Sequence, residues 1–75
     1  MWTFDYQDLH FRIFQKGTRF ILEIAGVSYG SYSSPQKAAD DVACFATQCS
    51  EWDELDGQIT DYPSDLSEWT DLYKR

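Results

Sequence analysis

Carboxylates are the residues of this sequence best suited to chemistry, because they are numerous and unevenly distributed. Residues 40–75 contain ten acids against Lys74 and Arg75, a net charge of −8, and no basic residue lies between Asp40 and Tyr73. Residues 1–39 carry a net charge of +1, so the total of −7 comes from the second half. An array of this kind can bind a basic partner, hold a divalent cation or supply general acids and bases. The predicted binding residues are Asp40, Asp41, Glu51, Asp53, Glu54, Asp56, Asp61, Asp65, Glu68 and Asp71.

One acidic stretch, Asp53–Ile59, has the alternating oxygen ligands and the glycine of a calcium-binding loop. If Gly57 is the sixth position of such a loop, the first position is Trp52 and the twelfth is Pro63, so both obligatory carboxylates are missing. The stretch is therefore predicted to be a solvated acidic turn, with weak divalent binding as the alternative. His10 is the single histidine, which leaves a zinc site short of ligands. We expect no metal and no cofactor.

Side chains that could act as nucleophiles have simpler explanations. Ser33 and Ser34 precede a predicted helix and suit its N-terminal cap, while His10 lies on a predicted strand with no identifiable partner. Cys44 and Cys49 are interpreted as ordinary thiols of a reducing compartment. The sequence therefore predicts a protein that is not an enzyme.

From its hydropathy pattern we expect neither a membrane span nor an export signal. It has no run of 18 apolar residues, and residues 1–7 alternate polar and apolar side chains without a charged and then apolar leader. Its 75 residues suffice for one domain, 1–75, and its 13 aromatic side chains compensate for a small core. We expect a single cytoplasmic domain that does not contact membranes.

Residues 34–49 are predicted to form a central helix, which positions the first two carboxylates. Ser34 can cap its first turn, and Pro35 fits the first helical position because its missing N–H needs no partner there. Apolar residues recur at three- and four-residue steps and form one stripe, made of Ala38, Ala39, Val42, Phe45, Ala46 and Cys49. Because alanines permit close approach, we expect this helix to lie across a sheet.

Residues 1–32 alternate polar and apolar side chains, as the strands of an antiparallel sheet do. The alternation changes parity near Gln7–Asp8, which indicates a bulge in the first strand or a break that splits it in two. Lys16–Gly17 and Ala25–Gly26 are tight-turn signals between the following strands. The predicted fold is α+β: a three-stranded antiparallel meander, with its first strand bulged or split, packed on the helix at 34–49.

The C-terminal part is predicted to close the domain. Residues 50–63 form an acidic loop in this interpretation, held to the core by Trp52, Leu55 and Ile59. A short C-terminal helix is predicted over 64–73, with Ser64 as its cap and carboxylates in its first turn. The apolar stripe of this helix consists of Leu66, Trp69 and Tyr73.

The junction of the third predicted strand and the helix matches a family pattern. The run Gly26–Ala39, GVSYGSYSSPQKAA, contains a glycine, an aromatic residue, a serine and a later Ala-Ala pair at the spacing of that pattern. Over residues 9–47 the chain resembles the AP2/ERF-type DNA-binding domain and its bacterial integrase-arm relatives, which share the β-β-β-α order. The resemblance implies a sheet face that binds DNA, here through Arg12 and Arg19. The acidic half would repel phosphate.

Size, charge and aromatic content resemble those of small acidic inhibitors of phage and mobile-element origin, including anti-CRISPR and anti-restriction proteins. A rigid body with carboxylates along one side is similar in charge to a phosphate backbone, and its field would steer it to basic surfaces. We therefore predict a protein-binding module that acts as a DNA mimic. Its partner would be a basic protein or a nucleic-acid-binding complex, whose basic groove it would occupy.

Two alternatives use the sheet instead. In the first, the protein is a small bacterial interaction domain that binds a partner through its aromatic sheet face, where Phe14 and Ile21 join Arg12 and Arg19. In the second, the same two arginines bind nucleic acid in the AP2-like manner. The sequence leaves monomer and dimer open, since an exposed edge strand could pair with a copy of itself.

Overall fold

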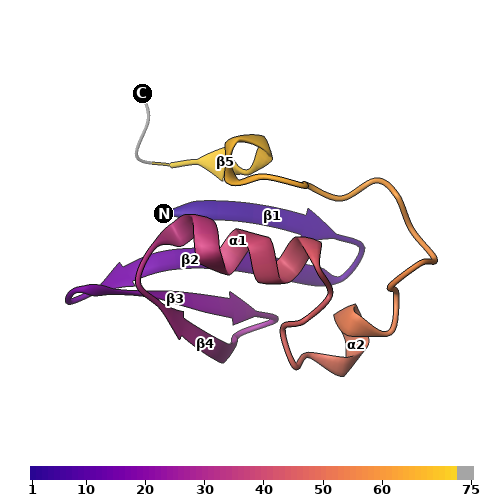
Figure 1. Cartoon of the computed structure of the whole chain (residues 1–75), viewed down its shortest axis with the longest axis horizontal. Coiled ribbons are helices and arrows are strands. Elements are labelled where there is room, and N and C mark those ends of the chain that lie inside the picture. Colours follow the sequence, from indigo (N-terminus) through magenta and orange to yellow (C-terminus); the bar gives the residue numbers. More distant parts are fainter. Residues whose placement is uncertain (73–75) are drawn as a thin grey trace.

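Five antiparallel strands form one sheet in the spatial order β4-β3-β2-β1-β5. The structure is a computed structural model that describes residues 1–72. Helix α1 lies across one face of the sheet, and the chain then runs through α2 and the 3-10 turn η1 back to β1 (Figure 1). The predicted α+β class is confirmed. The elements are β1 (Trp2–Tyr6), β2 (Leu9–Lys16), β3 (Arg19–Ile24), β4 (Val27–Tyr32), α1 (Pro35–Ala43), α2 (Ser50–Asp53), η1 (Leu66–Glu68) and β5 (Thr70–Asp71).

The parity change near residue 7 is a hairpin turn between β1 and β2. The register pairs Tyr6 with Leu9, and Gln7 adopts a positive φ of 53°, as tight hairpin turns often require. Of the two predicted alternatives, a bulge or a split, the structure has the split, which gives β1 and β2. The sheet has five strands because β5, which was not predicted, joins its edge. The turn was hard to recognise because it contains no glycine, and β5 because it has only two residues.

The hydrophobic core lies between the sheet and α1. Small side chains on the helix let it approach the strands closely. As a result Ala38, Ala39 and Val42 are fully or almost fully buried. The strands contribute the large apolar residues, which alternate with polar residues facing away from α1. The fully buried side chains on the strands are Phe11, Ile13, Leu22 and Ile24.

Trp52 is the largest fully buried side chain and joins α2 to this core. Its indole N–H donates to the carbonyl oxygen of Val42 at 2.9 Å. Its ring also lies within contact distance of five other aromatic rings, those of Phe4, Tyr6, Phe11, Phe45 and Tyr62. Trp52 therefore holds the start of the acidic C-terminal half against the sheet.

Helix α1 begins where the sequence predicted and ends earlier. Ser34 caps it by accepting a hydrogen bond from the Lys37 N–H at 3.3 Å. The predicted helix over 34–49 is corrected to Pro35–Ala43. Phe45 takes a φ of 54°, and its N–H and that of Ala46 return to carbonyls of the last helical turn at 3.2 and 3.0 Å. This is a Schellman motif, and it stops the helix.

The C-terminal helix predicted over 64–73 is not present in the described residues. Asp65 caps the single turn η1, and the next residue after that turn, Trp69, is 5% exposed. The chain then becomes extended, and β5 pairs with Trp2 and Thr3 of β1. Burial of Trp69 against the aromatic rings of the sheet favours this extended path over further helix. The predicted helix end at Tyr73 lies outside the described residues.

Candidate functional site

The ten predicted carboxylates lie on the chain from α1 to β5, which runs along the helix side of the sheet and around its end (Figure 1). No basic residue occurs in the described part of this chain, residues 40–72. Three of the carboxylates are on half-buried residues, Asp41, Asp53 and Asp71. The other seven are on exposed residues, namely Asp40, Glu51, Glu54, Asp56, Asp61, Asp65 and Glu68.

Asp53 has a structural role that its sequence position did not reveal. Its carboxylate accepts hydrogen bonds from the Thr47 N–H at 3.1 Å, the Thr47 hydroxyl at 2.8 Å and the Gln48 N–H at 2.8 Å. Thr47 is 1% exposed, so it depends on this partner. Asp53 therefore fixes the connection between α1 and α2, and its charge is already engaged within the protein.

Asp41 is engaged in a similar way. It accepts a hydrogen bond from the Tyr32 hydroxyl at 2.8 Å, which ties α1 to β4. Burial, and secondly this hydrogen bond, raise the pKa of Tyr32 well above its ordinary value. Tyr32 therefore remains a neutral donor to Asp41 under physiological conditions.

Three exposed carboxylates accept hydrogen bonds from neighbours. Asp40 accepts from the Gln36 side chain at 2.8 Å, and Glu68 accepts from the Ser64 hydroxyl at 2.9 Å. Asp65 accepts from the Ser67 N–H at 3.0 Å, and this backbone bond is the main cause that lowers the pKa of Asp65. These contacts hold the three side chains in place while leaving them at the surface.

Glu51, Glu54 and Asp56, on α2 and the turn after it, make no side-chain hydrogen bond within the described residues; we call them the α2 acidic patch. They are exposed and close together in the chain, so together with Asp61, which is also exposed, they are the carboxylates most available to a partner. Asp8, from the β1–β2 turn, lines a hollow of about 190 Å³ together with Glu51. Sequence reasoning missed Asp8 because only the hairpin brings it to the acidic side.

The opposite face of the sheet has a different character. Cross-strand pairing places Phe14 opposite Ile21, and Lys16 opposite Arg19. The four residues predicted for a sheet-face site, Arg12, Phe14, Arg19 and Ile21, therefore share one face. Phe14 and Ile21 line a shallow hollow of about 440 Å³ on it.

Both arginines of this sheet face already have partners. Arg12 donates to Glu23 at 2.7 Å through two of its nitrogens and lies over the Phe14 ring, 5.0 Å from its centre. Arg19 donates to the hydroxyl and the carbonyl oxygen of Ser31 at 3.0 and 2.8 Å. Because Glu23 neutralises Arg12, the phosphate-binding capacity of this face is reduced.

Groups with catalytic potential are few in the described structure. His10, for which the sequence showed no partner, forms a hydrogen bond with Asp5 across the β1–β2 hairpin, and both side chains are exposed. Cys44 and Cys49 are free thiols, the first exposed and the second buried. Within residues 1–72 no group of three or more His, Cys, Asp and Glu side chains is placed to hold a metal ion, and no helix is long and apolar enough to cross a membrane.

Comparisons with protein-family models, with curated proteins and with solved structures gave no match. The functional argument therefore depends on the geometry and charge of the surfaces described above.

Proposed function

We propose that this protein is a non-enzymatic binding module whose acidic half binds a basic protein. The observation that carries the proposal is the separation of charge across the sheet. All charged residues from 40 to 72 are acidic, whereas three of the four basic residues of the described chain, Arg12, Lys16 and Arg19, lie on the sheet face away from α1. Such a field steers a basic partner to one side of the molecule.

The partner that suits this surface best is a cytoplasmic protein or complex that handles nucleic acid. Its groove is built to neutralise regularly spaced phosphates, and carboxylates held on a rigid scaffold offer a similar array. The hydrogen bonds to Asp40, Asp65 and Glu68 support this role, because they fix charges at the surface. An inhibitor of the anti-CRISPR or anti-restriction type, acting as a DNA mimic, fits these properties.

A second candidate function uses the sheet face. The hollow beside Phe14 and Ile21 offers apolar surface that none of the helices within residues 1–72 covers, which favours an interaction domain that binds a neutral partner. The AP2-like alternative, direct DNA binding through Arg12 and Arg19, is less favoured. Glu23 pairs with Arg12 on that face, and the acidic half opposes phosphate.

The test is capture of partners from host lysate with matched charge variants. One variant neutralises the α2 acidic patch by Glu51→Gln, Glu54→Gln and Asp56→Asn. Its control, Gln15→Lys with Thr18→Lys and Val27→Lys, changes the net charge equally but at exposed positions on β2, β4 and the β2–β3 turn that do not line the sheet-face hollow.

We expect the unmodified protein and the control to retain a basic nucleic-acid-binding complex that high salt and added DNA release, and the patch variant to lose it. Equal retention by all three proteins would remove the α2 acidic patch from the site. A neutral partner that survives high salt, and that is lost on Arg12→Glu with Arg19→Glu, would establish the sheet-face function instead.

A further inference from the structure

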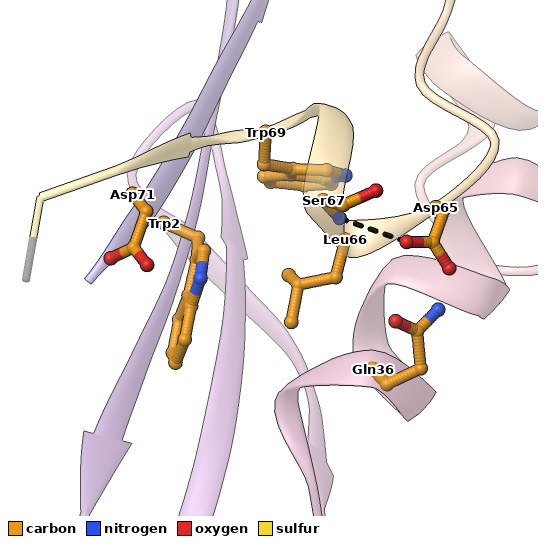
Figure 2. Close-up of a pocket in the computed structure, with 7 residues that line it drawn as sticks. All are labelled: Trp2, Gln36, Asp65, Leu66, Ser67, Trp69 and Asp71. Carbon is orange, nitrogen blue, oxygen red and sulfur yellow. Dashed lines mark hydrogen bonds between the residues drawn. The ribbon is translucent and has the colours of Figure 1, made fainter. Parts of the chain in front are cut away.

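A hollow of about 330 Å³ lies where β1, the first turn of α1, η1 and β5 meet. Two indoles, Trp2 and Trp69, form part of its wall, and Leu66 contributes apolar surface between them (Figure 2). The carboxylates of Asp65 and Asp71 flank it from opposite sides. The hollow thus combines aromatic surface with negative charge, at a point where four elements converge.

Its electrostatics favour a cation. No Lys or Arg lines the hollow among the described residues. Hydrogen bonds from Ser67 and, to a smaller extent, Gln36 keep the pKa of Asp65 below its ordinary value, so this carboxylate is ionised at neutral pH. Asp71 adds a second negative charge at the opposite side of the hollow, and this charge also acts on the α-amino group of Met1. An indole face attracts a cation through its quadrupole, and this adds to the effect of the carboxylate.

A second, independent feature of the hollow also indicates a ligand. Trp69 is 5% exposed, and its indole N–H is the only buried side-chain polar group of the described residues without a hydrogen-bond partner. Native structures rarely leave such a donor unsatisfied. Figure 2 places the ring nitrogen at the end of the indole next to Ser67 and toward Asp65. An acceptor oxygen brought in at Ser67 would satisfy it once the exposed Ser67 side chain turns aside.

We propose that this hollow binds an arginine residue of the basic partner, an inference that rests on the proposed function. The planar guanidinium stacks on the Trp2 indole and donates to the Asp65 carboxylate, while its methylene stem lies on Leu66. The backbone carbonyl of the same arginine supplies the acceptor for the Trp69 N–H. A lysine ammonium fits less well, because it is more strongly hydrated and has no plane to stack.

The proposal can be tested on the isolated full chain with N-acetyl-L-arginine amide as the probe. Each of the three tryptophans gives one indole N–H signal in a ¹H–¹⁵N NMR spectrum. We expect the Trp2 and Trp69 signals to shift on titration, with the Trp69 proton moving downfield as it gains an acceptor. The Trp52 signal should not move, because that N–H already donates to Val42. The dissociation constant should be on the order of millimolar, as for one anchor side chain.

Matched ligands and variants make the result decisive. The norleucine amide, which lacks the charge, should not bind, and the lysine amide should bind more weakly than the arginine amide. Asp65→Asn keeps an acceptor for Ser67 and removes the charge, so affinity should fall about five- to tenfold. The control Asp61→Asn makes the same change at an exposed residue outside the hollow. If Asp65→Asn disturbs the fold, Asp71→Asn probes the opposite wall and should also weaken binding.

Equal affinity for the arginine and norleucine amides, or equal loss in the Asp65 and Asp61 variants, would overturn the arginine site. Tighter binding of the lysine amide would overturn the guanidinium assignment, and a Trp69 signal that stays in place would overturn the role of its N–H. These outcomes are distinguishable from failure of the proposed function. The probe requires no partner protein, and the capture experiment alters the α2 acidic patch, which does not line the hollow.

Discussion

The indole of Trp52 donates to the carbonyl oxygen of Val42 at 2.9 Å, so a residue of α2 adds a second hydrogen bond to a carbonyl that already accepts from the Phe45 N–H at the end of α1. The same indole stacks on Phe45 with 4.8 Å between ring centres. One side chain therefore joins the end of α1, the start of the acidic half and the sheet beneath them.

Replacing Trp52 by phenylalanine should destabilise the protein by about 2 kcal/mol. The smaller ring leaves a cavity and removes the hydrogen bond to Val42. Urea unfolding measures the change, and Trp2→Phe is the control because Trp2 is only half-buried. Equal losses in the two variants would contradict the central role of Trp52.

The positive φ of Phe45 should be detectable as strain. Both Phe45→Ala and Phe45→Gly lose the stacking on Trp52, but only glycine adopts a φ of 54° without steric cost. We expect the glycine variant to be more stable than the alanine variant by about 1 kcal/mol in urea unfolding. An alanine variant of equal or higher stability would show that this backbone conformation is not strained.

Asp53 and Glu54 are adjacent, yet their substitution should affect stability to very different extents. Asp53→Ala leaves three donors on Thr47 and Gln48 without their acceptor and should cost about 2–3 kcal/mol. Glu54→Ala removes an exposed carboxylate and should change stability by less than about 0.5 kcal/mol. Thermal unfolding of both variants at equal concentration compares them. A stable Asp53→Ala protein would return Asp53 to the set of available binding residues.

Because the pKa of Tyr32 is raised, we expect the protein to lose stability at alkaline pH. Its pKa is raised in the folded protein above the ordinary value of 10.0, so folding favours the neutral phenol. This contribution is fully present below pH 10 and is lost as the pH rises from there toward the raised pKa. Between pH 8 and pH 11 the free energy of unfolding should therefore fall more for the unmodified protein than for the Tyr32→Phe variant. Parallel losses would show that the Tyr32–Asp41 contact does not depend on the proton.

The sequence predicted those parts of the fold that depend on local chemistry. The start of α1 follows from Ser34 and Pro35, whose preferences act within a single turn. The end of α1 depends on Phe45, whose conformation is held by stacking on a residue of the next helix, and no glycine marks the position. Likewise, β5 exists only because β1 lies beside it, which a window of sequence cannot show.

For the candidate site, the sequence predicted the charge distribution but not which carboxylates are available to a partner. Charge and its distribution are properties of the sequence, so the acidic half was recognisable before any fold was known. Which carboxylates are available is a property of tertiary contacts, as the hydrogen bonds to Asp41 and Asp53 illustrate. The position of Asp8 beside Glu51 depends in the same way on the hairpin between β1 and β2.

The pairing of β5 with β1 has a consequence for the kinetics of folding. Strands β1 to β4 are joined by tight turns, so only short loops have to close when they pair. In contrast, β5 pairs with Trp2 and Thr3, which lie almost the whole chain away in sequence. The Leu72 N–H also donates to the Met1 carbonyl at 2.7 Å. Closing so long a loop has the larger entropic cost, so we expect this pairing to form last and to open first. Amide hydrogens of β5 should then exchange before those of β2 and β3, and the wall of the hollow that contains Trp69 should open more often than the sheet formed by β2 and β3.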